Sequence, residues 1–149
     1  MNKKWGKRKM LGTLAVAITI VLVIIVAGLM RIDNWSRDFT ENSAAIDADF
    51  PDSVVLLDSR LQRWVAATPR WEVQSKTESD GAIEYKITRT TPLFRFVDDI
   101  HVKLVPDDGG EGTRMNASSQ SRVGKGDLGQ NPRNLAQLLE GLRTPDDAN

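Results

Sequence analysis

Polar and glycine residues that could form a binding or catalytic site are concentrated between residues 119 and 133. An arginine such as Arg122 binds a carboxylate or a phosphate through its planar fork of N–H donors. A carboxylate such as that of Asp127 accepts backbone N–H groups in a tight loop, and glycines such as Gly124 and Gly129 allow the positive φ that tight loops need. The candidates for a ligand site or a polar network are Asp98, Asp99, Ser121, Arg122, Gly124, Asp127, Gly129, Asn131 and Arg133.

Residues 124–129 match the pattern Gly-x-Gly-x-x-Gly, which binds the pyrophosphate of dinucleotides in one class of α/β fold. That fold needs another parallel strand after the helix and an acidic residue about 20 positions further on. The residues after this segment carry no strand pattern, so we expect no nucleotide site. The segment is instead interpreted as a strand-to-helix corner in which Arg122 pairs with Asp98 or Asp99 and Arg133 contacts the same cluster. This network either fixes the loop or binds a ligand or partner.

Other residues that could do chemistry do not combine into a site. Asp98 and Asp99 point to opposite faces of a strand, so they cannot share one proton or one metal ion. His101 is the only histidine and has no ligand at metal spacing, so we expect an ordinary exposed side chain. A Ser-His-Asp triad through Ser119 or Ser121 lacks the Gly-x-Ser-x-Gly elbow. The absence of cysteine excludes thiol chemistry and disulfides, and we expect neither a metal nor a cofactor.

Alternating apolar and polar residues predict four strands connected by short turns. They cover residues 71–77, 82–90, 97–105 and 111–120. Helices with apolar stripes are predicted at residues 52–67 and 132–142, the first capped by Asp52 or Ser53 and the second by Asn131. Short turns between neighbouring strands favour an antiparallel meander.

An apolar run lies between the second and third predicted strands. Its residues Leu93, Phe94 and Phe96 are interpreted as core packing. The alternative is an exposed apolar loop that contacts a membrane or a partner protein.

Residues 10–30 form an apolar segment without a charged side chain. As a helix this segment would span roughly 31 Å, close to the thickness of a bilayer's hydrocarbon core. Five basic residues precede it, which by the positive-inside rule places the N-terminus in the cytoplasm. A cleaved signal peptide is the alternative, but its apolar region is usually shorter. The segment therefore predicts a single-pass anchor in the bacterial inner membrane, with the C-terminal domain in the periplasm and the lipid bilayer as a partner.

The predicted fold class is α+β: a single N-terminal transmembrane helix followed by a small domain with a four-stranded antiparallel sheet and helices packed on one face. The predicted organisation is a cytoplasmic basic tail at 1–9, the transmembrane helix at 10–30, a connector at 31–50, the α+β domain at 51–143 and a disordered tail at 144–149. Residues 10–149 carry 15 basic and 20 acidic side chains, and this acidic balance argues against nucleic acid as a partner.

The segment Ser119-x-Ser121-Arg122-Val123-Gly124, followed by Asp127-Leu128-Gly129-x-Asn131 and by Arg133, resembles the bacterial and plastid domain-of-unknown-function family 1499. Phe94-x-Phe96-Val97-Asp98-Asp99 belongs to the same resemblance, which covers about residues 45–142. It implies a compact domain, often attached to a membrane, with no established activity. Two features depart from the family: Ser118 stands where members often have arginine, and no cysteine-containing segment precedes the first helix.

Three functional hypotheses follow. The first is a non-enzymatic envelope module that binds a protein partner or a lipid-like ligand through Arg122, Asp127 and Arg133. The second is a hydrolase-like enzyme that uses Asp98, Asp99, Arg122 and Asp127. The third is a purely structural domain. Carboxylates that converge on an open pocket would favour the enzyme, whereas carboxylates closed into pairs under the last helix would contradict it.

Overall fold

The computed structural model describes residues 3–29, 37, 40–107, 109 and 111–143. The chain divides into two compact units, residues 1–35 and residues 36–149. The first unit holds helix α1 (Lys3–Leu29), and the second holds every other helix and strand described below. Most of the predicted connector before residue 40 and all of the predicted tail at 144–149 lie outside the described residues.

The prediction of a transmembrane helix at residues 10–30 is corrected. In the part of the chain that the structure describes, none of the helices combines the length and apolar character needed to cross a membrane. Helix α1 includes residues 10–29 of the predicted segment, and Met30 lies outside the described residues.

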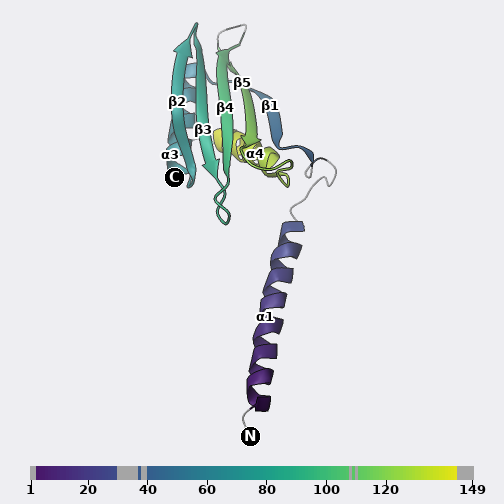
Figure 1. Ribbon diagram of the computed structural model, residues 1–149. Helices are drawn as coiled ribbons and strands as arrows, with labels where there is room; N and C mark the ends of the chain where they lie inside the picture. The colour runs from purple at the N-terminus through teal and green to yellow at the C-terminus, as the bar shows by residue number, and fades with distance from the viewer. Residues whose placement is uncertain (1–2, 30–36, 38–39, 108, 110, 144–149) are drawn as a thin grey trace. The chain divides into compact units, whose positions relative to one another are not determined.

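The second unit is built on an antiparallel sheet of five strands, so the prediction of four strands was wrong. The strands are β1 (Ser43–Phe50), β2 (Trp71–Ser79), β3 (Ala82–Thr90), β4 (Val97–Pro106) and β5 (Thr113–Ser121). Their order across the sheet is β1-β5-β4-β3-β2 (Figure 1). The strands β2 to β5 form the predicted meander, and β1 joins its β5 edge, with Ser43 opposite Gln120 and Phe50 opposite Thr113.

The additional strand β1 occupies residues that we expected to be a connector. Its inward positions include Ala48 and Phe50, which are buried, while Asp47 and Asp49 are exposed. Alanine and aspartate are both depleted in strands, so the alternation in this segment gives only a weak local signal. Its pairing partner β5 lies about 70 residues further along the chain, and only the tertiary structure brings the two together.

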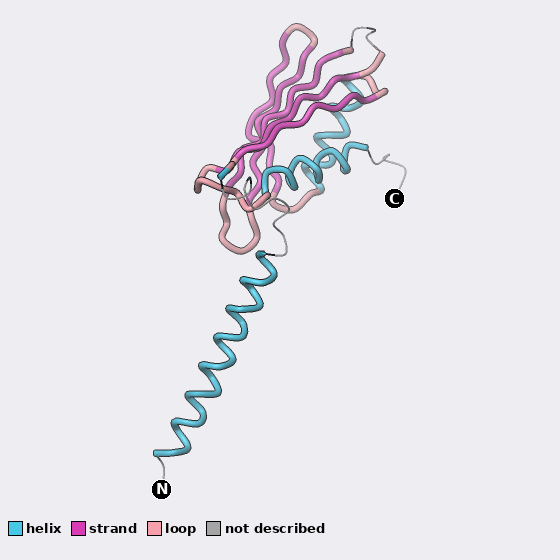
Figure 2. Tube along the Cα trace, turned by 90° about the vertical axis from the view of Figure 1, so that its right-hand side faces the viewer, coloured by secondary structure: helices cyan, strands magenta, loops and turns pink. Residues whose placement is uncertain are grey.

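Two helices cover one face of the sheet (Figure 2). Helix α3 (Val54–Ala67) begins after Ser53, whose side chain accepts a hydrogen bond from the backbone N–H of Leu56 and so confirms one of the two predicted caps. Helix α4 (Gln130–Arg143) presents a buried stripe that includes Leu135, Leu138 and Leu142. Together with the inward residues of the strands, these helices enclose a single hydrophobic core.

A β-bulge in β2 changes which face its side chains occupy. The strand pairs Val73 with Ile87, but Ser75 rather than Gln74 is opposite Lys86. Strict alternation, which the sequence predicts for residues 71–77, would place Ser75 on the same face as Trp71 and Val73, and this prediction fails at Ser75. Beyond the bulge, Ser75 lies on the uncovered face, and Lys76 lies on the helix-covered face opposite Tyr85.

Candidate functional site

Five polar side chains form a buried cluster between β4, β5 and α4, which we call the α4 network. Its members are Asp98, Ser119, Ser121, Asn131 and Asn134, and all are buried. The hydroxyl of Ser119 donates to Asn131 Oδ1 at 2.6 Å, and the hydroxyl of Ser121 donates to Asp98 Oδ1 at 2.7 Å. Asn134 Nδ2 donates to Asp98 Oδ2 at 2.9 Å. Both carboxylate oxygens of Asp98 are therefore hydrogen-bonded by neutral groups beneath the helix.

Asn131 connects this network to the segment that precedes β1. Its Nδ2 donates to the carbonyl of Asn42 at 2.6 Å and to the hydroxyl of Ser121 at 3.1 Å. The backbone N–H of Ser121 donates to the same Asn42 carbonyl at 3.0 Å. The α4 network therefore holds β1, β5 and α4 together at one end of the sheet.

Asp127 fixes the start of α4. Its two carboxylate oxygens accept from the backbone N–H groups of Gly129 and Asn131 at 2.8 and 2.7 Å. Leu128 and Gly129 have φ of 52° and 71°, and the N–H of Gln130 closes the turn by donating to the Asp127 carbonyl. The prediction that Asn131 caps this helix was wrong, because Asn131 is inside the helix and Asp127 supplies the acceptor. The predicted positive φ is confirmed at Gly129 and at Gly124, where φ is 99°.

Arg122 and Asp99 form an ion pair on the other face of the sheet. The Nε and Nη2 atoms of Arg122 donate to the two carboxylate oxygens of Asp99 at 2.8 and 2.7 Å. These hydrogen bonds lower the pKa of Asp99 and raise the pKa of Arg122. Because both side chains are largely exposed, the pair contributes little to stability.

The predicted site residues do not converge on a shared pocket. Asp98 and Asp99 point to opposite faces as expected, with Asp98 in the α4 network and Asp99 paired to Arg122. Arg133 does not join them, and its Nη2 donates to the Leu128 carbonyl at 2.5 Å. Among the residues that the structure describes, no three His, Asp or Glu side chains are placed to hold a metal ion.

A second polar cluster lies between α3 and the sheet, and the sequence did not predict it. Asp58 is buried and accepts hydrogen bonds from the Tyr85 hydroxyl at 2.5 Å, from Gln62 Nε2 at 2.9 Å and from Lys76 Nζ at 3.0 Å. Burial first, and the hydrogen bond to Asp58 second, raise the pKa of Tyr85. Hydrogen bonds to Glu78 and to Asp58 raise the pKa of Lys76. We call this set the α3 cluster.

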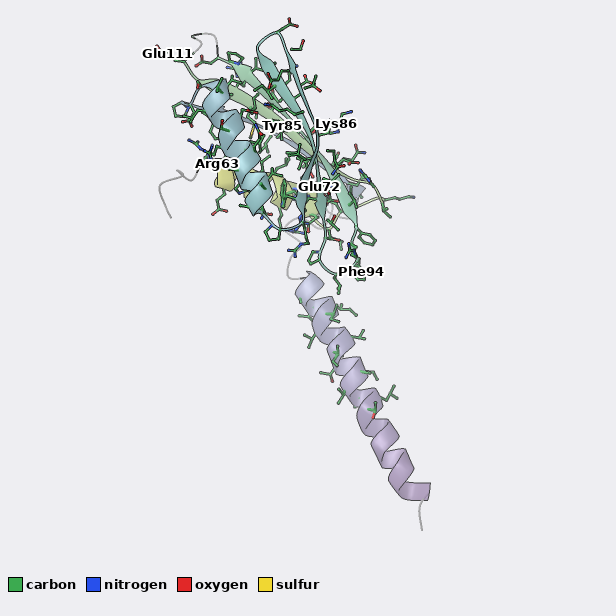
Figure 3. The ribbon with its side chains drawn as sticks, turned by 90° about the vertical axis from the view of Figure 1, so that its left-hand side faces the viewer. Arg63, Glu72, Tyr85, Lys86, Phe94 and Glu111 are labelled. Carbon is green, nitrogen blue, oxygen red and sulfur yellow. The ribbon has the colours of Figure 1, made fainter. Side chains whose placement is uncertain are left out.

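The uncovered face of the sheet carries a row of polar side chains that crosses four strands. Cross-strand pairing aligns Ser75, Lys86, His101 and Ser118, and we call these residues the open row. Figure 3 shows Lys86 on the side of the sheet away from α3, whereas its neighbour Tyr85 points toward that helix. Within the described part of the chain, no hydrogen bond or ion pair engages these four side chains.

The open row lines one side of a hollow of about 340 Å³. The next cross-strand row lines the other side, and its charged members are already paired. Lys103 Nζ lies 2.8 Å from the carboxylate of Glu84, and Asn116 donates to Asp47 at 2.6 Å. The hydrogen bond from Lys103 lowers the pKa of Glu84. The open row therefore presents hydrogen-bond donors to the hollow. The carboxylates of the other row, those of Glu84 and Asp47, already accept from Lys103 and Asn116. For Lys86, His101 and Ser118 the only sequence signal was the polar side of each predicted strand. Ser75 had no such signal, because strict alternation assigned it to the opposite face.

Comparisons with known proteins give a family but no activity. A search of curated proteins finds no match. A solved structure from Nitrosospira multiformis is 11% identical with a TM-score of 0.44, and covers 67% of this chain and 92% of its own. A solved structure from Thermus thermophilus is 14% identical with a TM-score of 0.33, and covers 67% of this chain and 93% of its own. Residues 36–142 match the family described as "Protein of unknown function (DUF1499)", so the chain belongs to that family, as its sequence indicated.

Proposed function

We propose that residues 36–149 form a non-enzymatic binding module whose open row binds an anionic group of a polar ligand. The observation that carries this proposal is the set of uncommitted donors that face the hollow. The carboxylates that the sequence suggested for catalysis, those of Asp98, Asp99 and Asp127, all accept hydrogen bonds within the domain. The side chains of the open row make no hydrogen bond or ion pair among the described residues. Donors of this kind on an ordered surface are available to a ligand.

The donor set favours an acceptor-rich ligand. An ammonium group donates three hydrogen bonds and accepts none, and the imidazole and hydroxyl groups beside it also donate. A carboxylate or phosphate group matches this set, because hydrogen bonds between charged partners are about twice as strong as neutral ones. The Lys103 ion pair offsets the negative charge of Glu84 across the hollow, so that carboxylate does not exclude an anion.

The hydrolase-like alternative lacks its required geometry. An acid–base pair needs two titratable groups with separated pKa values in one cleft. Asp98 and Asp99 lie on opposite faces, and Asp127 is used by backbone N–H groups at the start of α4. The use of the Arg122 loop as a ligand site stays a prediction. The hydrogen bonds of Arg122 and Asp127 support a role of this loop in holding the fold.

An NMR titration of residues 36–149 with pyrophosphate and with citrate tests the open row. We expect the amide signals of Lys86, His101 and Ser118 to shift with either anion. Replacing Lys86→Gln removes a charged donor and should weaken binding about tenfold.

The matched control is Arg114→Gln, which makes the same charge change on the same face but outside the lining of the hollow. This variant should bind both anions as the unaltered domain does. Equal weakening by the two variants would show that net charge alone attracts the anions. Shifts confined to the Arg122 loop would contradict the open row and favour the loop instead.

A further inference from the structure

One end of the sheet carries a cluster of exposed apolar side chains, which we call the apolar tip. It consists of Leu93, Phe94, Phe96, Val123 and Leu128, which are 69%, 68%, 49%, 62% and 45% exposed. These residues come from the β3–β4 loop and the β5–α4 loop. Both loops lie at the same end of the sheet, where Asp98 is opposite Ser121 and the N–H of Arg122 donates to the carbonyl of Val97, the first residue of β4. The expectation that the run at 93–96 packs in the core was wrong. Contiguous exposed apolar side chains mark surfaces that contact a partner protein, a membrane or a ligand.

The β3–β4 loop holds its rings outward in a defined conformation. The N–H of Thr91 donates to the Phe96 carbonyl, and the N–H of Phe96 donates to the Thr91 hydroxyl, both at 2.8 Å. The rings of Phe94 and Phe96 stack with centroids 5.6 Å apart. Figure 3 shows Phe94 at the end of the sheet opposite Glu111. The rings therefore project from a closed loop and are not collapsed onto the domain.

Backbone strain coincides with the same tip. Among the described residues, four other than glycine have positive φ, and one of them, Asp80, belongs to the tight β2–β3 turn. Another, Arg70 at 70°, lies in the turn between α3 and β2, whereas Arg95 at 55° and Leu128 at 52° belong to the two loops of the tip. Left-handed conformations of such residues cost free energy and are concentrated where function requires them.

The charges of the two loops indicate what covers the tip. Residues 91–96 and 122–129 contain the basic residues Arg95, Arg122 and Lys125 and one acidic residue, Asp127. Arg122 is paired with Asp99, and the carboxylate of Asp127 is directed at backbone N–H groups of α4. Among the described residues, Arg95 and Lys125 are therefore the basic side chains of the two loops that make no ion pair. Apolar side chains among cations match an anionic phospholipid surface, where rings enter the boundary of the acyl chains and cations meet the headgroups.

We propose that the apolar tip docks the domain onto the surface of an anionic phospholipid bilayer. Phe94, Phe96 and Leu93 enter the interface, and Arg95 and Lys125 contact the headgroups. The surface is distinct from the open row, so the two proposals succeed or fail independently.

Sedimentation of residues 36–149 with vesicles tests this docking. This unit is suited to the test because every residue of the hydrophobic core lies between Ala44 and Leu142. Vesicles of phosphatidylcholine alone are compared with vesicles that also contain phosphatidylglycerol. We expect binding to the anionic vesicles that weakens as salt is raised. The double variant Phe94→Ser with Phe96→Ser should weaken this binding at least about tenfold, because two apolar rings no longer leave water.

The matched control is Val55→Ser, which removes an apolar side chain that is 74% exposed at the start of α3. Thermal unfolding of each variant establishes that it is folded. Binding that is absent, that is equal on neutral and anionic vesicles, or that falls equally with Val55→Ser would overturn the proposal. A second pair of variants, Arg95→Gln and Lys125→Gln, should reduce binding to anionic vesicles while leaving unfolding unchanged.

Discussion

At the scale of single residues, Asn131 and Arg122 illustrate two kinds of hydrogen-bonded side chain. Asn131 is completely buried, and its amide satisfies Ser119, Ser121 and the Asn42 carbonyl at once. Arg122 also makes good hydrogen bonds, but to an exposed partner. Removing a buried partner leaves polar groups that water cannot reach, whereas an exposed ion pair competes with water in either state.

We therefore expect Asn131→Ala to lower the free energy of unfolding by about 3 kcal/mol, because several buried groups lose their partner. Arg122→Ala should lower it by less than about 1 kcal/mol. Urea unfolding of residues 36–149 measures both values. Equal losses in the two variants would contradict the assignment of the α4 network as the polar support of this corner.

The α3 cluster makes a prediction about alkaline pH. The folded state raises the pKa of Tyr85 and of Lys76 above their usual values of about 10 and 10.4, so it holds both protons more tightly than the unfolded chain. The stability that this provides is fully present below about pH 10 and is lost as the pH rises through the folded values. Unfolding followed from about pH 8 to about pH 12 should therefore show a decline that begins near pH 10.

Tyr85→Phe measures how much of the alkaline loss of stability comes from ionisation of the Tyr85 hydroxyl. At neutral pH the variant should lose about 1–2 kcal/mol, because Asp58 loses one of its buried donors. At alkaline pH its remaining decline should be shallower than that of the unaltered domain, since only Lys76 still contributes. A decline of unchanged slope would show that Tyr85 is not linked to folding through its proton.

At the scale of secondary-structure elements, the contact between α3 and α4 depends on a glycine. A Cβ atom added at Gly141 would lie 1.9 Å from Nε1 of Trp64 on α3. The same indole packs edge-on against Trp71 of β2 at a centroid distance of 4.7 Å, so it has little freedom to move. The close approach of the two helices therefore requires the absence of a side chain at this position.

Gly141→Ala should destabilise the domain by about 1–3 kcal/mol because the added methyl group overpacks this contact. Helix propensity alone would predict the opposite sign, since alanine stabilises a helix by about 1 kcal/mol relative to glycine. Gln137→Ala, on the exposed side of the same helix, is the control and should change stability little. A stabilised Gly141→Ala variant would show that α4 can move away from Trp64 at no cost.

The β2 bulge has a comparable effect on the sheet. It places Lys76 on the helix-covered face, where it reaches Asp58, and it places Ser75 in the open row. One inserted residue thus contributes to both the α3 cluster and the proposed ligand surface. Strict alternation, which was the basis of the strand prediction, assigns both residues to the wrong faces.

At the scale of the whole molecule, the polar clusters under the helices and the two proposed binding surfaces lie on different parts of the domain. The α4 network and the α3 cluster both lie on the helix-covered face, where they fix the positions of α3, α4 and β1. The open row lies on the other face, and the apolar tip lies at one end of the sheet. Each surface can therefore be altered without disturbing the core, which is what the two binding experiments require.

Elements with local patterns could be predicted from the amino-acid sequence. The meander of β2 to β5, the Ser53 cap and the positive φ of Gly124 and Gly129 follow from hydrophobic period and from backbone sterics within a few residues. The opposite directions of Asp98 and Asp99 follow from the same period.

Features that join residues far apart in the chain could be seen only in the folded domain. The strand β1 forms because β5 offers it an edge, and Asp58 meets Lys76 because a bulge changes the face of one strand. The exposure of the apolar tip and the available donors of the open row depend on which surfaces the two helices cover. Local sequence patterns carry no information on these features, because strand pairing and the burial of each surface arise from the packing of the whole domain.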